Sequence, residues 1–120
     1  MQNKVLCVDD EPQVLRAFQR HFLDDYDLST ANSGAEALKI AENEGPFSVV
    51  VSDLQMPGMD GIALLTAVRE RWPETMRIML TGKANLDAAI EAVNQGNVFR
   101  FLTKPTSAEV LHHAIDEALE

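Results

Sequence analysis

The sequence predicts an α/β fold, a doubly wound parallel sheet of five strands flanked by five helices. Short apolar runs alternate along the chain with segments whose apolar residues recur every three or four positions. This alternation of strand and helix favours a parallel sheet with helices on both faces. The length of 120 residues, 46% of them hydrophobic, fits one globular domain with its own core.

Five runs are predicted as strands: residues 5–8, 27–31, 47–52, 77–81 and 98–102. The first, third and fourth runs are almost wholly apolar, as strands covered on both faces should be. The second run alternates in polarity and Arg100 interrupts the fifth, so these two are placed at the sheet edges. Right-handed crossovers then give strand order 2-1-3-4-5. In this order the winding reverses between the first and third strands, and a ligand is expected beyond their carboxyl ends.

The predicted helices follow the strands and begin at recognisable signals. Ser33 with Glu36, and Thr106 with Glu109, each fit a capping box at the start of the second and fifth helices. Apolar residues at helical spacing mark the five segments in turn: Val14, Leu15, Phe18 and Phe22; Ala37, Leu38 and Ala41; Leu64, Leu65, Val68 and Trp72; Leu86, Ala89, Ile90 and Val93; and Leu111, Ala114, Ile115 and Ala118.

Charge and composition exclude several functions. Ten basic residues against nineteen acidic ones leave a net charge of -9, which argues against gripping a nucleic-acid backbone and suits a cation site or a basic protein partner. Cys7 is the single cysteine, so no internal disulfide can form, and it is expected to be a buried hydrophobe. No apolar stretch approaches the roughly 18 residues of a membrane span, so we expect the cytoplasm as location and no membrane contact.

Five polar residues stand where the predicted strands end. Asp9 and Asp10 follow the first strand, Asp53 follows the third, Thr81 closes the fourth and Lys104 follows the fifth. Because the carboxyl ends of parallel strands share one edge of the sheet, we expect these side chains to converge. Three carboxylates at close range stay ionised only beside positive charge. Mg²⁺, which prefers oxygen ligands, is the expected cation.

A metal, an ammonium group and a hydroxyl around one carboxylate suit phosphoryl transfer. The cations would neutralise the equatorial oxygens of the phosphoryl group. The central carboxylate, Asp53, could be the nucleophile and form an acyl phosphate. Local roles remain open: Asp10 and Glu11 as caps of the first helix, Asp53 as a turn residue, Thr81 as a cap of the fourth helix, and Lys104 as a solvated turn residue. None of these explains why all lie after strands at one edge.

The motifs "VDDEP", "VSDLQMPGMDG", "MLTG" and "FLTKP" resemble, in this order and spacing, the receiver (REC) domain of two-component response regulators. The resemblance covers essentially the whole chain and implies a flavodoxin-like fold. It implies that Asp53 is the phosphoacceptor. It also implies that Asp9 and Asp10 hold Mg²⁺, or Mn²⁺ in its place, with Asp10 the closer ligand and the backbone carbonyl of Gln55 a third protein ligand.

The resemblance further assigns the residues of a switch. Thr81 would supply the switch hydroxyl, Lys104 would contact the phosphoryl group, and Phe101 would be the aromatic switch residue. The peptide bond between Lys104 and Pro105 is expected to be cis. The donor would be a histidine kinase or a phosphotransfer protein. The surface of the fourth helix, fifth strand and fifth helix would then change, to be read by a partner or by a second receiver protomer.

The expected role is therefore a phosphoacceptor switch and not an enzyme, apart from its own phosphorylation and dephosphorylation. The alternative is a Mg²⁺-dependent phosphohydrolase with an aspartyl-phosphate intermediate. Such enzymes often carry an acid two residues after the nucleophile, where this chain has Gln55. A flavin or nucleotide module is disfavoured because "DDEPQ" repels phosphate, and a degenerate docking receiver is disfavoured by the complete residue set. Residues 1–120 are expected to form one receiver domain, either a whole regulator or part of a longer one.

Overall fold

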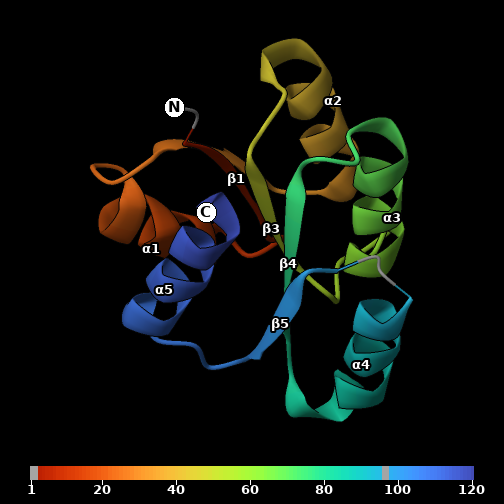
Figure 1. The fold of residues 1–120 in the computed structure, drawn as a ribbon. Helices are drawn as coiled ribbons and strands as arrows, with labels where there is room; N and C mark the ends of the chain where they lie inside the picture. The colour runs from red at the N-terminus through yellow and green to blue at the C-terminus, as the bar shows by residue number, and fades with distance from the viewer. Residues whose placement is uncertain (1–2, 96–97) are drawn as a thin grey trace.

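The sheet contains five parallel strands: β1 (Lys4–Val8), β2 (Asp27–Ala31), β3 (Val49–Asp53), β4 (Met76–Thr81) and β5 (Arg100–Thr103). They pair in the order β2-β1-β3-β4-β5, as Figure 1 shows for this computed structural model, which describes residues 3–95 and 98–120. Neighbouring strands are parallel throughout. The predicted fold class and strand order are confirmed.

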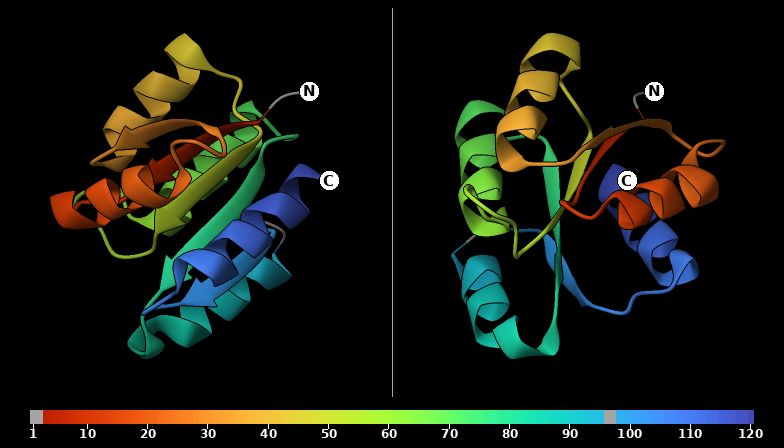
Figure 2. Two further views of the ribbon diagram at one scale, coloured as in Figure 1. Left: turned by 90° about the vertical axis from the view of Figure 1, so that its left-hand side faces the viewer. Right: turned by 180° about the vertical axis from the view of Figure 1, so that it is seen from behind.

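Helices cover both faces of this sheet. They are α1 (Pro12–Phe22), α2 (Gly34–Glu44), α3 (Gly61–Arg71), α4 (Leu86–Asn94) and α5 (Ala108–Leu119), with a short 3₁₀ turn, η1 (Lys83–Asn85), before α4. α1 and α5 lie on one face, and α2, α3 and α4 lie on the other (Figure 2). The loops that follow β1, β3, β4 and β5 line one depression at the carboxyl ends of the strands.

Two hydrophobic cores lie on the two faces of the sheet. Successive strand residues point to opposite faces, so Leu6 and Val8 pack under α2, α3 and α4, while Val5 and Cys7 pack under α1 and α5. Each fully buried aliphatic side chain contributes roughly 1.5–3 kcal/mol. This burial on both faces explains the almost wholly apolar central strands and fixes their register.

The strand limits differ from the predicted ones by one or two residues. The third strand begins at Val49 rather than at residue 47, and the fifth covers Arg100–Thr103 rather than 98–102. Phe47 and Val98 are buried and therefore resemble strand residues in the sequence. Burial alone does not place a residue in the hydrogen-bonded ladder, and both lie in the connections that lead into it.

One of the two predicted caps is correct, and the other is displaced by one residue. The Ser33 hydroxyl accepts a hydrogen bond from the N–H of Glu36 at 3.1 Å, which caps α2. The predicted Thr106 cap is wrong: Ser107 caps α5, since its hydroxyl accepts from the N–H of Val110 at 3.1 Å. The Thr106 hydroxyl instead donates to the carbonyl of Thr103 at 2.6 Å, which closes the preceding turn.

Cys7 is fully buried, as predicted, and has no disulfide partner. Burial raises the pKa of its thiol to about 12, because removal from water disfavours the charged thiolate. Within the described part of the chain, the helices are all too short or too polar to cross a bilayer.

Candidate functional site

Three carboxylates converge at the carboxyl edge of the sheet. Asp9 and Asp10 follow β1, and Asp53 is the last residue of β3. Each offers an oxygen atom within 4.8 Å of the oxygen atoms offered by the other two. Asp9 is 0% exposed and Asp53 is 7% exposed, whereas Asp10 faces solvent. For these three of the five predicted residues, the convergence of positions far apart in the sequence is confirmed.

Lys104 brings a positive charge into this cluster. Its backbone N–H donates to the carbonyl of Thr81 at 2.8 Å, which extends the pairing of β4 and β5 into the loop. The Nζ atom lies 2.8 Å from Oδ1 of Asp53 and 3.3 Å from Oδ2 of Asp9. The following Lys104–Pro105 peptide bond is cis, as predicted.

The protonation balance of the site follows from burial and charge together. Burial raises the pKa of Asp53, and the nearby Asp9 and Asp10 raise it further, while Lys104 opposes both. Burial lowers the pKa of Lys104, but its contacts with Asp53 and Asp9 outweigh burial and hold the pKa above the ordinary lysine value. Lys104 therefore stays charged at neutral pH and partly compensates the carboxylates.

The carboxylate of Asp9 is held in place by two neighbouring groups. Oδ1 of Asp9 accepts a hydrogen bond from the N–H of Glu11 at 2.9 Å, and Oδ2 faces Nζ of Lys104. Asp10 instead lies at the rim of an open depression of about 370 Å³ together with Glu11, Asp53, Gln55, Gly82 and Lys104. Carboxylate oxygens beside solvent-filled space fit Mg²⁺, which binds few carboxylates and retains several waters.

The loop after β3 is built by a turn and a helix start. Gly58 adopts φ +75°, a conformation that favours glycine. Asp60 then caps α3, because its Oδ1 accepts from the N–H of Ala63 at 2.9 Å. The N–H of Leu54 donates to the carbonyl of Leu80 at 2.9 Å, so the loop leaves β3 still attached to β4. These contacts hold Gln55 at the mouth of the depression.

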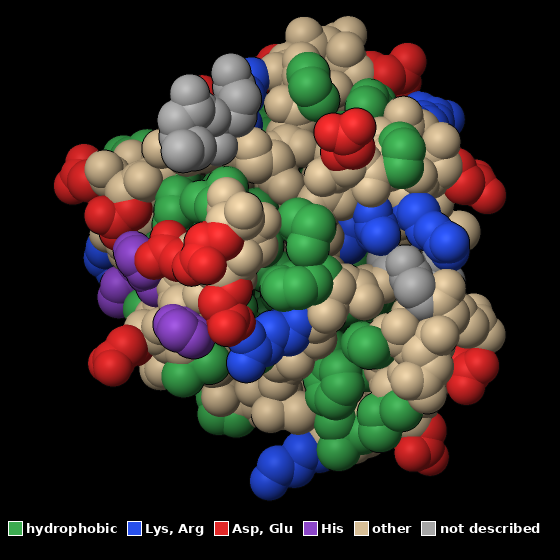
Figure 3. Space-filling view, in the orientation of Figure 1, with side chains coloured by type: hydrophobic (Ala, Val, Ile, Leu, Met, Phe, Trp, Pro, Cys, Tyr) green, Lys and Arg blue, Asp and Glu red, His purple; other side chains and the backbone are tan. Residues whose placement is uncertain are grey.

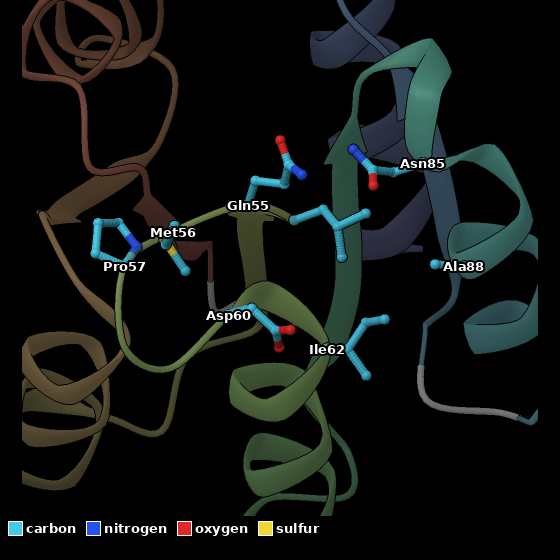
Figure 4. A pocket seen from close by; sticks show the side chains of 8 residues that line it. Gln55, Met56, Pro57, Asp60, Ile62, Asn85 and Ala88 are labelled. Carbon is cyan, nitrogen blue, oxygen red and sulfur yellow. The ribbon is translucent and has the colours of Figure 1, made fainter.

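A second hollow of about 450 Å³ lies on the other side of this loop, between β3, α3 and the start of α4. Figure 4 shows the side chains of Gln55 and Asn85 on opposite sides of its opening, with Asp60 and Ile62 below them. Gln55 lines both hollows. Its side chain therefore stands between the carboxylate site and the N-terminal end of α4.

The sequence of this chain matches a known protein family. A family model described as "Response regulator receiver domain" matches residues 5–116. The chain belongs to the response regulator receiver domain family. A curated relative, the transcriptional regulatory protein GlrR of Escherichia coli, is 39% identical over 97% of this receiver, which covers 26% of GlrR. The receiver thus spans about a quarter of the length of this relative.

Solved structures share the receiver's architecture. A chain titled as adenylate cyclase from Rhodopirellula baltica superposes with TM-score 0.96 and 38% identity, covering 99% of the receiver and 88% of that chain. The chemotaxis protein CheY4 of Vibrio cholerae superposes with TM-score 0.88 and 31% identity, covering 99% of the receiver and 100% of that chain. The flavodoxin-like topology expected from the sequence is confirmed.

The two proposed switch residues of the receiver lie on neighbouring strands, Thr81 at the end of β4 and Phe101 in β5. Thr81 is 0% exposed, and its hydroxyl donates to the carbonyl of Gly82 at 3.2 Å. Phe101 is half-buried and packs against the core under α2, α3 and α4. It pairs with Met79, while Thr81 pairs with Thr103, so the period-two pleat places the Phe101 and Thr81 side chains on the same face of the sheet. Their roles stay predictions.

Three contributors to the receiver's site were missed at the sequence level. The backbone N–H of Glu11 orients Asp9, Gly82 lines the depression, and Gly61 lies against the backbone of Asp53. Only Gly61 had a signal, since a glycine directly after a helix cap is a poor helix former and requires a steric reason. A backbone donor such as that of Glu11 leaves no trace in the residue type.

Proposed function

We propose that this receiver is a phosphoacceptor switch in which Asp53 takes the phosphoryl group. One observation carries the assignment: the Asp53 carboxylate opens on the depression, with Nζ of Lys104 at 2.8 Å and the oxygens of Asp9 and Asp10 within 4.8 Å. Asp10 is exposed and Asp9 already has two partners. Of the three, Asp53 is thus the carboxylate with both a fixed cation and access to an incoming group.

The transfer step needs only groups at this site. An oxygen of Asp53 attacks phosphorus, the new O–P bond forms as the donor's N–P bond breaks, and the departing imidazole nitrogen takes up a proton from solvent. Lys104 stabilises charge on the equatorial phosphoryl oxygens. Attack by water on the phosphorus later breaks the O–P bond and releases inorganic phosphate. The receiver thus acts on its own side chain and turns over no separate substrate.

The acidic cluster would hold a divalent cation. Asp10, Asp53 and the backbone carbonyl of Gln55 are the proposed direct ligands, and Asp9 supports them. When bound, Mg²⁺ neutralises charge on the transferring oxygens, and Mn²⁺ is expected to replace it. Because Asp9 is engaged by Glu11 and Lys104, we assign it the task of fixing Lys104 and adding negative charge behind the ligands.

Phosphorylation would then be read through Thr81 and Phe101. An acyl phosphate brings about −1.5 to −2 charges by analogy with other phosphorylated side chains. The Thr81 hydroxyl would leave its contact with Gly82 and donate to the phosphoryl group. A hydrogen bond to a charged group contributes roughly 1.5–3 kcal/mol, which shifts a two-state equilibrium by about one to two decades. Phe101 would fill the space that Thr81 vacates.

The surface near Thr81 and Phe101 is suited to report phosphorylation. Ile90 on α4, Phe99 before β5 and Val110 on α5 are large hydrophobic residues that remain exposed. Figure 3 shows hydrophobic side chains gathered over α4 on this face. We propose that a protein partner or a second receiver protomer reads this surface, without direct contact with nucleic acid.

The phosphoryl donor is proposed to be the phosphohistidine of a sensor kinase or phosphotransfer protein. Receiver domains of response regulators partner with histidine kinases in two-component systems. The relatives named above include a transcriptional regulator, a chain titled adenylate cyclase and a chemotaxis protein. This range supports the receiver role itself rather than one output, and we propose that residues 1–120 act as one receiver unit.

A phosphohydrolase is not favoured. Gln55 stands where a second acid would assist turnover, and the depression of about 370 Å³ is open, with no segment covering it among the described residues. Release of phosphate from small phosphomonoesters over many turnovers would favour the hydrolase. A single phosphoryl group per chain would favour the switch.

Phosphoryl uptake from a small acyl phosphate tests the proposal. Wild-type protein with Mg²⁺ and acetyl phosphate should gain one phosphoryl group per chain, whereas Asp53→Asn should gain none. Asp24→Asn, which removes an exposed carboxylate after α1, is the matched control and should behave as the wild type. Uptake by Asp53→Asn at wild-type stoichiometry would refute the acceptor assignment.

A further inference from the structure

We propose that Gly61 is a positioning residue for the phosphoacceptor, an inference that rests on the function proposed above. Gly61 is the first residue of α3, and its N–H donates to the carbonyl of Leu54 at 2.8 Å. A Cβ atom at this position would lie 2.3 Å from the carbonyl oxygen of Asp53 and 2.9 Å from Cα of Leu54. Both atoms belong to the peptide unit that joins Asp53 to the next residue, and that unit is planar and stiff.

This peptide unit has little freedom to move aside. Asp53 is paired with Leu80 in the ladder between β3 and β4, and the N–H of Leu54 donates to the carbonyl of Leu80 at 2.9 Å. The Ser52 hydroxyl donates to the carbonyl oxygen of Asp53 at 2.9 Å. Because β1 and β4 hold the strand on both sides, a methyl group on the helix side would rotate the peptide at the cost of these hydrogen bonds rather than displace the strand. That rotation would turn the Asp53 carboxylate away from its 2.8 Å contact with Lys104.

The same rotation would affect the metal site. The displaced peptide leads directly into Gln55, whose backbone carbonyl is a proposed ligand. The absence of a side chain at Gly61 thus lets the first turn of α3 seat the phosphoacceptor and this carbonyl together. The residue contacts neither phosphoryl group nor metal, so its effect acts through Asp53.

Two other glycines in the chain allow the steric effect to be separated from general damage. Gly34 is also the first residue of a capped helix, but a Cβ there would meet the side chain of Met59 and no backbone atom, with Sδ at 2.8 Å, Cγ at 2.9 Å and Cβ at 3.0 Å. A Cβ at Gly45 would lie 2.3 Å from the carbonyl oxygen of Ala41, a backbone contact as close as that at Gly61. Gly45 lies at the C-terminal end of α2, at the opposite edge of the sheet.

The experiment compares Gly61→Ala, Gly45→Ala and Gly34→Ala. The initial rate of phosphoryl uptake from acetyl phosphate, the Mg²⁺ affinity by calorimetry and the thermal midpoint are measured for each. Gly61→Ala should slow uptake at least about tenfold and weaken Mg²⁺ binding, since misplacement by about 1 Å near a reacting group costs up to about 10²-fold. Gly45→Ala should lower the thermal midpoint by a similar amount yet keep both site properties within about twofold of wild type. Gly34→Ala should lower the thermal midpoint, because Met59 must shift, and should keep both site properties closer to the wild type than Gly61→Ala does.

Gly61→Ala with wild-type uptake and affinity, or Gly45→Ala impaired as much as Gly61→Ala, would overturn the inference. A poorly folded variant is measured with trimethylamine N-oxide, which favours the folded state. If Gly61→Ala remains unfolded there while Gly45→Ala folds, Gly61 serves the fold and the inference is wrong. Failure of the proposed function looks different, because then the wild type takes up no phosphoryl group or Asp53→Asn takes it up equally.

Discussion

Replacing Lys104 with methionine tests the electrostatic account of the site. The change keeps an unbranched side chain of similar length and removes the charge that contacts Asp53 at 2.8 Å and Asp9 at 3.3 Å. Even in a water-like dielectric these contacts correspond to about 1.5 and about 1.3 kcal/mol of Coulomb attraction. Removing one partner of a buried pair costs about 3–5 kcal/mol. Because the Lys104 side chain is 29% exposed, we expect the lower end, about 3 kcal/mol at neutral pH.

The loss of stability in Lys104→Met should depend on pH in a defined direction. The pKa of Asp53 is raised in the folded wild type, and without Lys104 it rises further. Ionised Asp53 therefore opposes folding above that pKa, and the penalty disappears as pH falls toward the unfolded value of about 3.9. The difference in the free energy of unfolding between Lys104→Met and wild type should decrease from neutral pH to about pH 4. At the alkaline end, the raised pKa of Lys104 means that the wild type keeps this stabilisation below about pH 10.4 and loses it as pH rises through the folded-state pKa.

Urea unfolding followed by circular dichroism, in the presence of a chelator, measures this gap. Lys39→Met, which removes an exposed lysine on α2, is the control and should change stability by less than about 0.5 kcal/mol at every pH. A gap of equal size at neutral and acidic pH would show that Lys104 stabilises through packing alone. A Lys104→Met protein as stable as wild type at neutral pH would refute the electrostatic reasoning.

Three further predictions concern the metal, the switch and the core. Mg²⁺ at about a hundred times its dissociation constant should raise the free energy of unfolding by about 2.7 kcal/mol, and Asp10→Asn should lose most of that gain in the same urea titration. Thr81→Ala should still take up a phosphoryl group, but amide NMR shifts on α4, β5 and α5 should respond much less to beryllofluoride; an unchanged response would contradict the switch. Cys7, whose thiol pKa burial raises to about 12, should react with a disulfide reagent only when the protein unfolds, and rapid reaction in the folded state would contradict its burial.

The overall fold was accessible from the sequence because its signals are physical and repeated. Strands buried on both faces must be apolar throughout, and the strands that departed from this rule, β2 and β5, are the edges. Element limits were less accessible, because Phe47 and Val98 are buried without joining the ladder. The cap of α5 was displaced because Thr106 and Ser107 are both suitable hydroxyl residues, and only the turn at Thr103 distinguishes them.

The site, like the fold, could be predicted from the sequence only in part. Asp9, Asp53 and Lys104 could be brought together from the topology alone, since parallel strands end at one edge. Which hydrogen bonds each of them makes could not be predicted, because these depend on the backbone of the loops. The N–H of Glu11, for example, donates to one oxygen of Asp9. Gly61 was missed as well, although it had a signal, because its contribution is the room that it leaves for the backbone of Asp53 and Leu54.

The most direct test of the central claim is to locate the phosphoryl group chemically. Wild-type protein is phosphorylated with acetyl phosphate and Mg²⁺, reduced with borohydride, and digested for peptide mass spectrometry. An acyl phosphate on Asp53 should be converted to homoserine at position 53, with no conversion at Asp9 or Asp10. Homoserine at another acidic position, or a phosphoryl group retained on a residue other than aspartate, would contradict the account.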